Sequence, residues 1–337
     1  MEAPAEPWFS PLSEFYREVE RLFSKEWGHY AENVATSCGW PTGNAPEFWK
    51  GAGDELLYTK ELSDHREVLA CICCWAKAIN EYRGRLRERF PSLDLKSTAW
   101  VAGFPVHNAE VIFRAAVEKL DEQEDEDDPI YENLQLLEKF YSRRNSRGLA
   151  RDFIGPSIDT GFRLSTLATP RRFVISVELA LLLVAAERNR HQIMKTKYDA
   201  IKFHYAGRVP LKGVIGGLSY PVFWIDMHLH DKLSLSEDDL MGVQARNTDQ
   251  VSRFCEEFIN SNPDYFFHPY IVGDLQFNNI PESHQERLGK LNSFWESERK
   301  RRRGEALPLS DADAKLQDSD QGSAPIAPEK LFGRPNE

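Results

Sequence analysis

The chain has 337 residues, of which 41% are hydrophobic and 28% charged, a composition that excludes wholesale disorder and allows one large domain or two ordinary ones. Its net charge of −11 disfavours binding of a nucleic acid over the whole surface, because both would be negative. The longest apolar run, residues 177–186, is interrupted by Glu178 and is too short to span a bilayer. The N-terminus lacks the pattern of a secretory signal, so we predict a cytoplasmic protein without a transmembrane segment.

Apolar periodicity and turn residues predict four elements in the first third of the chain. Pro11 after Ser10 is typical of a helix start, and Asp64 with Glu67 three residues later resembles a capping box. Glycines between two short apolar runs favour a hairpin. In chain order, we expect a helix over residues 11–30, a hairpin over 47–60, a helix over 64–87 and a strand over 96–104.

Strands and helices are predicted to alternate in the rest of the chain, which ends in helices and a polar tail. Residues 121–128, DEQEDEDD, favour a solvated loop because their like charges repel. Residues 304–337 lose most large apolar side chains and are expected to be disordered. The other expected elements are a strand over 149–154, a helix over 156–168, a strand over 173–176, a helix over 177–188, strands within 198–225 and helices beyond 234.

The cysteines and the basic run have plain structural interpretations. Cys71, Cys73 and Cys74 fall in the apolar sequence CICC without a nearby histidine pair, which favours small buried residues in a reducing compartment over a zinc site. The run RKRRR at 299–303 favours a solvated helix end over a nucleic-acid site, because the protein is acidic and a disordered tail follows. We therefore expect no nucleic-acid partner and no membrane partner.

The sequence FWKGAGDELLY, residues 48–58, places a cation and carboxylates around glycines. Lys50 lies on the first arm of the expected hairpin, and Asp54 opens the second arm, where a carboxylate can reach a divalent ion. Taken alone, Lys50 is also typical of a solvated surface charge.

Two later segments hold polar residues at spacings that secondary structure alone does not require. RDFIGPSIDTGFRL ends a strand at Asp152 and then puts Asp159 and Arg163 on one helix face, at positions i and i+4. VPLKGVIGG holds Lys212 between a short apolar run and glycines. A surface ion pair and a solvated lysine are the alternatives for each segment taken singly. The order of all three segments is stronger evidence for a functional site than any one segment alone.

This ordered series resembles the class III nucleotide cyclases, the family of the adenylate and guanylate cyclase catalytic domains. KGAGD is similar to the family's lysine and metal-binding aspartate, and RDFIGPSIDTGFR resembles its aspartate, glycine, asparagine and arginine pattern, with Asp159 at the asparagine position. FSPLSE, RRFVISVELALLL and the Lys212-Gly213 pair resemble the first helix, the next strand and helix, and the closing hairpin. The resemblance covers residues 9–226.

The resemblance implies an α+β fold in which helices cover a βαββαβ sheet. It implies a catalytic domain over residues 1–233, with the N-terminal strand missing or short, a helical extension over 234–303 and the disordered tail. In this family the metal side and the base side of the site come from different subunits. A homodimer with two shared sites is therefore implied.

The resemblance also assigns roles to residues. Asp54 would hold a Mn²⁺ or Mg²⁺ ion that bridges the substrate triphosphate and helps activate the ribose 3′-hydroxyl. The other roles are contact with the base edge by Lys50 and Asp152, orientation of the ribose by Asp159, stabilisation of charge on the α-phosphate by Arg163, and binding of the terminal phosphates by Lys212.

GPSIDTGFR, the GDE triplet and GGLSYPVFWID look like the pyrimidine cyclases of the bacterial anti-phage system called Pycsar. The implied substrate is UTP or CTP, with UTP the preferred choice, and the cyclic product would act on a cyclic-nucleotide-responsive effector. Hydrogen-bond donors and acceptors on the base edge leave uracil and cytosine both open. The position of the family's first metal aspartate holds Ala5, with Glu6 the nearest acid. The alternatives are a cytidylate cyclase, or a catalytically dead cyclase-like dimer that acts as a binding or scaffold module.

Overall fold

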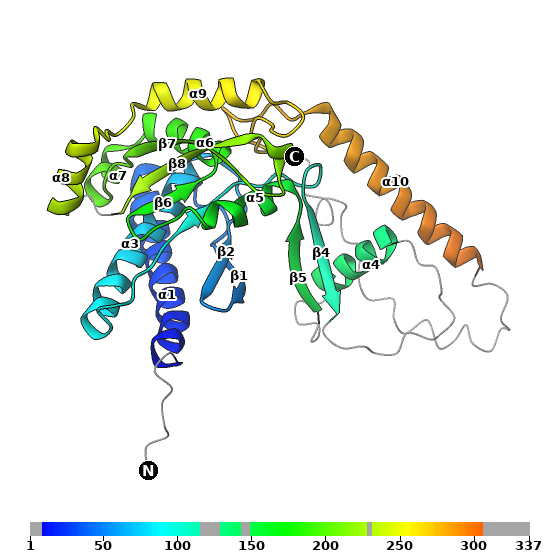
Figure 1. Cartoon of the computed structure of the whole chain (residues 1–337). Helices are drawn as coiled ribbons and strands as arrows, with labels where there is room; N and C mark the ends of the chain where they lie inside the picture. Colours follow the sequence, from blue (N-terminus) through cyan, green and yellow to red (C-terminus); the bar gives the residue numbers. More distant parts are fainter. Residues whose placement is uncertain (1–8, 115–128, 143–148, 228–230, 306–337) are drawn as a thin grey trace, which may run out of the picture. The chain divides into compact units, whose positions relative to one another are not determined.

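The computed structural model describes residues 9–114, 129–142, 149–227 and 231–305 (Figure 1). Its contacts divide the chain into two units, each made from separate stretches of sequence. The larger unit comprises Met1–Val101 and Pro156–Asn279, and the smaller unit comprises Ala102–Gly155 and Ile280–Glu337. Helices combine with a mixed sheet, which confirms the predicted α+β class.

A four-stranded mixed sheet in the order β3-β6-β8-β7 forms the centre of the larger unit. The strands are β3 (Thr98–Ala99), β6 (Arg172–Ile175), β7 (Phe203–Pro210) and β8 (Ser219–Asp226). β3 runs parallel to β6, whereas β6 and β7 each pair antiparallel with β8. Val174 and Ile175 of β6 and Phe223 of β8 are almost completely buried, as expected of central strands covered on both faces.

Helices pack around this sheet, and α6 (Val177–Arg188) contacts β8 (Figure 1). Ser176 caps α6 by accepting a hydrogen bond from the backbone N–H of Leu179. α6 contacts α3, α9 and β8, and its residues 179–186 are all buried. A helix that is apolar all round needs such a covering on every side. The other helices of this unit are α1 (Phe9–His29), α2 (Thr36–Cys38), α3 (Arg66–Arg89), α5 (Pro156–Ser165), α7 (Gln192–Lys197), α8 (Lys232–Met241) and α9 (Thr248–Asn260), with a π-helix at Tyr30–Ala35 and a 3₁₀ turn at Ile215–Gly217.

The hairpin of β1 (Glu47–Ala52) and β2 (Glu55–Thr59) is held at both of its ends. At the turn, the hydroxyl of Tyr16 on α1 donates a hydrogen bond of 2.7 Å to the carbonyl oxygen of Gly53. At the base, the ammonium of Lys60 forms a buried ion pair with Glu67 at the start of α3. The expected capping box is wrong: the Glu67 carboxylate binds Lys60 and the Ser63 hydroxyl. The Asp64 carboxylate accepts from the backbone N–H of Arg66, and the N–H of Glu67 donates to the Asp64 carbonyl instead.

The smaller unit has its own apolar cluster. β4 (Ala109–Arg114) pairs antiparallel with β5 (Leu149–Ile154), and α4 (Pro129–Ser142) and α10 (Glu282–Glu305) complete the unit. The Asn133 side chain donates to the carbonyl of Glu110 and accepts from the N–H of Ile112, so it satisfies backbone groups at the edge of β4. The buried side chains of the cluster are Ile112, Tyr131, Leu134, Leu136, Leu137, Leu288 and Trp295.

Most predicted elements are confirmed, with three corrections. The strand expected over 96–104 contains only the two residues of β3, because the chain leaves the sheet at Trp100, whose ring packs on α5. The sequence predicted neither β4 nor α4, and residues 261–281 are a loop rather than part of a helical stretch. The acidic run 121–128 and residues 306–337 lie outside the described residues, whereas Gly304 and Glu305 end α10. No helix in the described part of the chain is long and apolar enough to cross a membrane.

The close packing of α5 on Trp100 gives a test of the fold. A Cβ atom added at Gly161 would lie 2.1 Å from the Trp100 ring, whereas nothing lies within 4 Å of one added at the exposed Gly84 of α3. We therefore expect Gly161→Ala to lower the free energy of unfolding by about 1 to 3 kcal/mol through overpacking. Gly84→Ala should raise it by about 0.5 to 1 kcal/mol, because alanine favours the helix. Denaturant unfolding measures both, and equal effects at the two glycines would contradict the packing.

Candidate functional site

A β-bulge in the hairpin positions Lys50, one of the predicted site residues. Phe48 pairs with Tyr58, but the next pair is Lys50 with Leu57, so Trp49 is an extra residue in β1. In a regular strand, neighbouring side chains point to opposite faces, and a bulge changes that alternation. The ammonium of Lys50 consequently lies over the indole of its own neighbour, 4.5 Å from the ring centroid of Trp49.

The exposed face of α5 carries two of the predicted site residues. Asp159, Phe162 and Arg163 stand at i, i+3 and i+4, which places them on one face of the helix. Asp159 and Arg163 are exposed, and Phe162 is half-buried. The α5 helix begins with Pro156 at its first position, where a missing N–H costs nothing.

Phe162 links this face of α5 to the hairpin. Its ring centroid lies 5.7 Å from the Lys50 ammonium, 6.1 Å from the Trp49 ring and 5.6 Å from the Trp100 ring. The structure thus brings Lys50 to the helix that carries Asp159 and Arg163, although about a hundred residues separate these segments in sequence. The sequence predicted each segment but contained no signal for the aromatic contact that joins them.

Asp54 is exposed and lies in the turn directly before β2, after Gly53 with a φ of +66°. Mg²⁺ and Mn²⁺ prefer oxygen ligands, and Mg²⁺ is commonly bound by one or two carboxylates together with water and substrate phosphates. A single exposed carboxylate therefore fits such an ion when a triphosphate supplies further oxygens. The assignment of Asp54 as a metal ligand stays a prediction.

Lys212 is exposed in the connection between β7 and β8, where the backbone is strained. Ile215 has a φ of +46°, a left-handed conformation that is costly for a β-branched residue. Gly216 follows with a φ of +60°, and a Cβ there would lie 2.2 Å from the Tyr265 hydroxyl. The conformation of this turn is therefore fixed by packing, which presents Lys212 on a defined loop.

Asp152 belongs to the smaller unit. It lies in β5 opposite Val111 of β4, and one of its carboxylate oxygens accepts a hydrogen bond from the N–H of Phe153. Its contact with a nucleobase stays a prediction.

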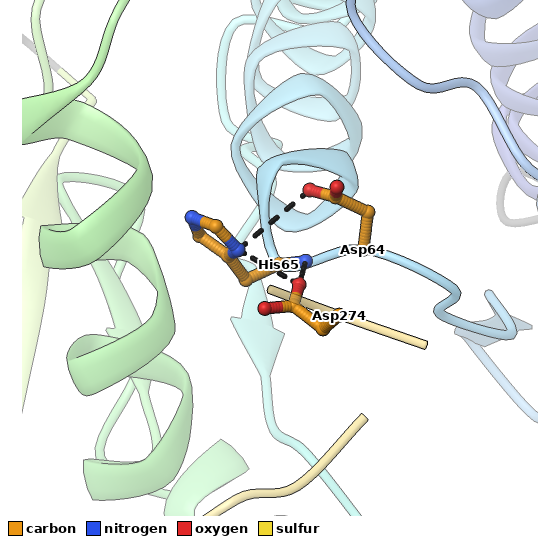
Figure 2. Close-up of side chains that lie close together, drawn as sticks. All are labelled: Asp64, His65 and Asp274. Atoms are coloured by element: carbon orange, nitrogen blue, oxygen red, sulfur yellow. Dashed lines mark hydrogen bonds and ion pairs between the residues drawn. The ribbon is translucent and has the colours of Figure 1, made fainter. Parts of the chain in front are cut away.

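The structure also groups three residues that the sequence did not identify as a site: Asp64, His65 and Asp274 (Figure 2). One atom of each that could bind a metal lies within 4.8 Å of the others. One oxygen of Asp274 accepts from the backbone N–H of His65 at 2.6 Å and from its Nδ1 at 2.8 Å. A separation of 209 residues between His65 and Asp274 explains why no local pattern could predict this cluster.

The remaining hydrogen bonds show what the cluster does. The other oxygen of Asp274 accepts from the backbone N–H groups of Gln276 and Phe277, at 2.7 and 2.8 Å. Asp64 accepts from the guanidinium and the backbone N–H of Arg66. All four carboxylate oxygens are thus engaged by N–H donors, and a positive guanidinium stands beside them. The cluster is therefore better suited to fastening the 271–277 loop to the start of α3 than to holding a cation.

The pKa values of these groups agree with a structural role. Burial raises the pKa of Asp274, but the N–H groups of His65, Phe277 and Gln276 outweigh it and leave the pKa below its ordinary value. The pKa of Asp64 is also lowered, because the Arg66 guanidinium and N–H outweigh burial there. Both carboxylates are therefore ionised at neutral pH.

The cysteines of the CICC sequence are free thiols. Burial raises the pKa of Cys73 to about 12, so this thiol stays protonated at neutral pH. None of these cysteines belongs to a candidate metal cluster among the described residues. The pattern thus agrees with the interpretation of small buried side chains.

No family model and no curated protein sequence matches the chain. Among solved structures, the chain is similar to the adenylyl cyclase CyaB from P. aeruginosa, with 12% identity over 66% of this chain and 84% of that one and a TM-score of 0.36. It is also similar to the guanylyl cyclase Cya2, with 16% identity over 65% of this chain and 86% of that one and a TM-score of 0.28. Both TM-scores are below 0.5, so the functional argument rests on the residues of this chain.

The Asp274 contacts lead to a pH prediction. Because its pKa in the folded state lies below the ordinary 3.8, the stabilisation is complete above about pH 5 and is lost as the pH falls through the folded pKa. Asp274→Asn should lower the free energy of unfolding by about 2 kcal/mol at pH 7, because an amide cannot accept from all of these donors. The difference from the wild type should shrink below about pH 4.

Chemical unfolding at pH 7, 5 and 3 measures this difference. Leu275→Ser is the matched control, because Leu275 lies in the same loop and is 90% exposed. If Asp274→Asn lowers the free energy of unfolding by the same amount from pH 7 to pH 3, the carboxylate charge is not involved.

Proposed function

We propose that the chain is a class III nucleotide cyclase that converts a pyrimidine nucleoside triphosphate, preferably UTP, into its 3′,5′-cyclic monophosphate and pyrophosphate. The observation that supports it most is the approach of Lys50 to the face of α5 that carries Asp159 and Arg163. Two segments chosen independently for their residue types meet in the folded larger unit.

The proposed reaction forms a bond between the ribose 3′-oxygen and the α-phosphorus and breaks the bond from that phosphorus to the bridging oxygen of pyrophosphate. The 3′-hydroxyl gives up its proton to water, and pyrophosphate leaves with the electron pair. A Mn²⁺ or Mg²⁺ ion held by Asp54 would offset the charge of the triphosphate and favour loss of that proton. Arg163 stabilises the charge that develops on the α-phosphate, and Asp159 orients the ribose. Lys212 binds the terminal phosphates.

Base selection is assigned to Lys50 and Asp152. With uracil, the ammonium of Lys50 donates to O4 and the carboxylate of Asp152 accepts from N3–H. With cytosine, Lys50 donates to N3 and Asp152 accepts from the exocyclic amine. Cytidylate cyclase is therefore the nearest alternative. In either case we propose that the cyclic nucleotide is a second messenger that acts on a responsive effector in anti-phage defence.

A second candidate is a catalytically dead cyclase-like dimer that serves as a binding or scaffold module. The observation that favours it is Ala5 at the position of the family's first metal aspartate. The two proposals differ in whether any nucleoside triphosphate is turned over.

Turnover is tested by incubating the protein with each of the four NTPs and Mn²⁺ or Mg²⁺ and identifying the products by mass spectrometry. We expect cyclic UMP and pyrophosphate. Asp54→Asn should abolish the product, because the metal can no longer be held against the triphosphate. Asp64→Asn is the matched control and should retain activity, because Asp64 binds Arg66 and not the substrate.

Cyclic CMP as the main product would replace uridylate by cytidylate cyclase. Cyclic AMP alone would reject the pyrimidine assignment. No cyclic product from a folded dimer, prepared also with any upstream in-frame extension, would favour the scaffold function.

The shared site of the proposed homodimer leads to a complementation experiment. Asp54→Ala and Arg163→Ala chains should each be inactive as homodimers, because every site then lacks one required group. Mixed dimers should recover about half of the wild-type activity, because one of their two composite sites is intact. Activity of tagged, purified mixed dimers is the measurement, and no recovery in dimers of confirmed composition would exclude a site shared between subunits.

A further inference from the structure

The β-bulge at Trp49 lies where β1 faces α5, and its consequence is local. It places two consecutive side chains, Trp49 and Lys50, together. Without the extra residue, Lys50 would point away from the indole, because side chains alternate along a strand. Bulges are often found beside functional sites, where they redirect one side chain.

The ammonium of Lys50 has aromatic rings from two different elements beside it. Trp49 of the hairpin lies 4.5 Å from it, and Phe162 of α5 lies 5.7 Å from it. Both distances are within the range of cation–π attraction, which is strongest for tryptophan. All three side chains are half-buried, so the rings reduce the exposure of the ammonium without sealing it from a ligand.

Phe162 is itself fixed in place. Trp100 packs on it at 5.6 Å and also lies against Gly161, where no side chain would fit. The bulge positions the indole from one side, and Trp100 with Gly161 positions the phenyl ring from the other. The rotamers of Lys50 are thereby restricted by these rings. The hairpin packs on the main core of the unit through other side chains, Leu56 and Tyr58.

We infer that Trp49 and Phe162 are positioning residues, which hold the Lys50 ammonium beside the exposed face of α5 by cation–π contact. The inference depends on the proposed function in one respect, the role of Lys50. In that function, Lys50 donates a hydrogen bond to the edge of a nucleobase. A flexible lysine loses several rotamers when it binds, so restricting it beforehand raises affinity without a new contact to the ligand. The base selectivity of the site would then depend on Trp49, a residue that does not need to touch the base.

The position of Lys50 can be tested in the free protein. With lysines carrying ¹³C-labelled methyl groups, the Lys50 signal, assigned by its loss in Lys50→Arg, should be shifted upfield by the ring current of Trp49. Trp49→Leu should remove that shift and Trp49→Phe should keep part of it, because phenylalanine restores an aromatic face. Phe48→Leu is the control, because Phe48 is a neighbouring aromatic residue of β1 whose ring packs on Tyr58. A Lys50 signal at the ordinary lysine position in the wild type would overturn the inference.

Nucleotide binding tests the consequence of that position. Calorimetry with α,β-methylene-UTP should show affinity reduced about two- to fivefold in Trp49→Leu, the range expected for a half-exposed cation–π contact. In a Lys50→Met background, the same substitution should change the affinity by less than about 1.5-fold, because residues that act through one another are not additive. An equal loss in both backgrounds would mean that Trp49 acts directly on the ligand or on the hairpin, and would overturn the inference.

Different results would reject the cyclase activity and the positioning of Lys50. A wild-type protein that binds none of the nucleoside triphosphates rejects the cyclase, while the ring-current shift still decides whether Trp49 positions Lys50. A protein that binds and cyclises UTP with a Lys50 signal unaffected by Trp49→Leu keeps the cyclase and rejects the positioning.

Discussion

The fold depends on the complete burial of α6. This helix presents apolar side chains in every direction, and Leu182 and Leu183 have no exposed surface. It must therefore be enclosed, and α3, α9 and the sheet do so. Truncating one such leucine to alanine typically costs about 2 to 5 kcal/mol, which is a large fraction of the stability of a domain. The arrangement of α3, α9 and β8 thus follows from one helix that has no polar side.

The candidate site lies where the regular structure is interrupted. The hairpin contains a bulge at Trp49, the turn after β7 contains Ile215 in a left-handed conformation, and α5 packs on Trp100 through a residue without a side chain. Each irregularity has an energetic cost that the surrounding packing sustains. The rest of the larger unit provides this support: Tyr16 of α1 and Glu67 of α3 hold the hairpin, and α5 contacts β3 and β6. The regular core of the unit thus supports the irregular segments at the candidate site.

The sequence predicted elements well where periodicity or turn residues were strong. The 47–60 hairpin, α3, α5, β6 and α6 all follow from local pattern. The α+β class came from the resemblance to a family. The sequence did not predict β4, because this strand forms a two-stranded sheet with β5 near a strongly acidic stretch. Apolar and polar residues alternate only weakly along it. Glu67 was misassigned as a cap because local spacing does not show that Lys60, buried beside it, needs a counter-charge.

The candidate site was predictable as residue types but not as an arrangement. Lys50, Asp54, Asp159, Arg163 and Lys212 were all chosen from their spacing, and the structure joins Lys50 to the face of α5. The aromatic rings that make this connection could not be predicted, because Trp49 and Phe162 meet only through tertiary packing. The same holds for the Asp274 contacts with His65, which depend on a loop more than two hundred residues away. Long-range contacts of this kind have no signature in a local window.

The smaller unit is built from two stretches that leave the ribosome at different times. Its α4 packs Tyr131, Leu134 and Leu137 in one cluster with Ile112 of β4, and this cluster is completed only when Leu288 and Trp295 of α10 are available. The whole of residues 156–279 is synthesised in between, which takes on the order of ten seconds at the usual rates of translation. During that interval the apolar face of α4 has no partner from α10. The nascent chain therefore presents a surface to chaperones that the finished protein conceals.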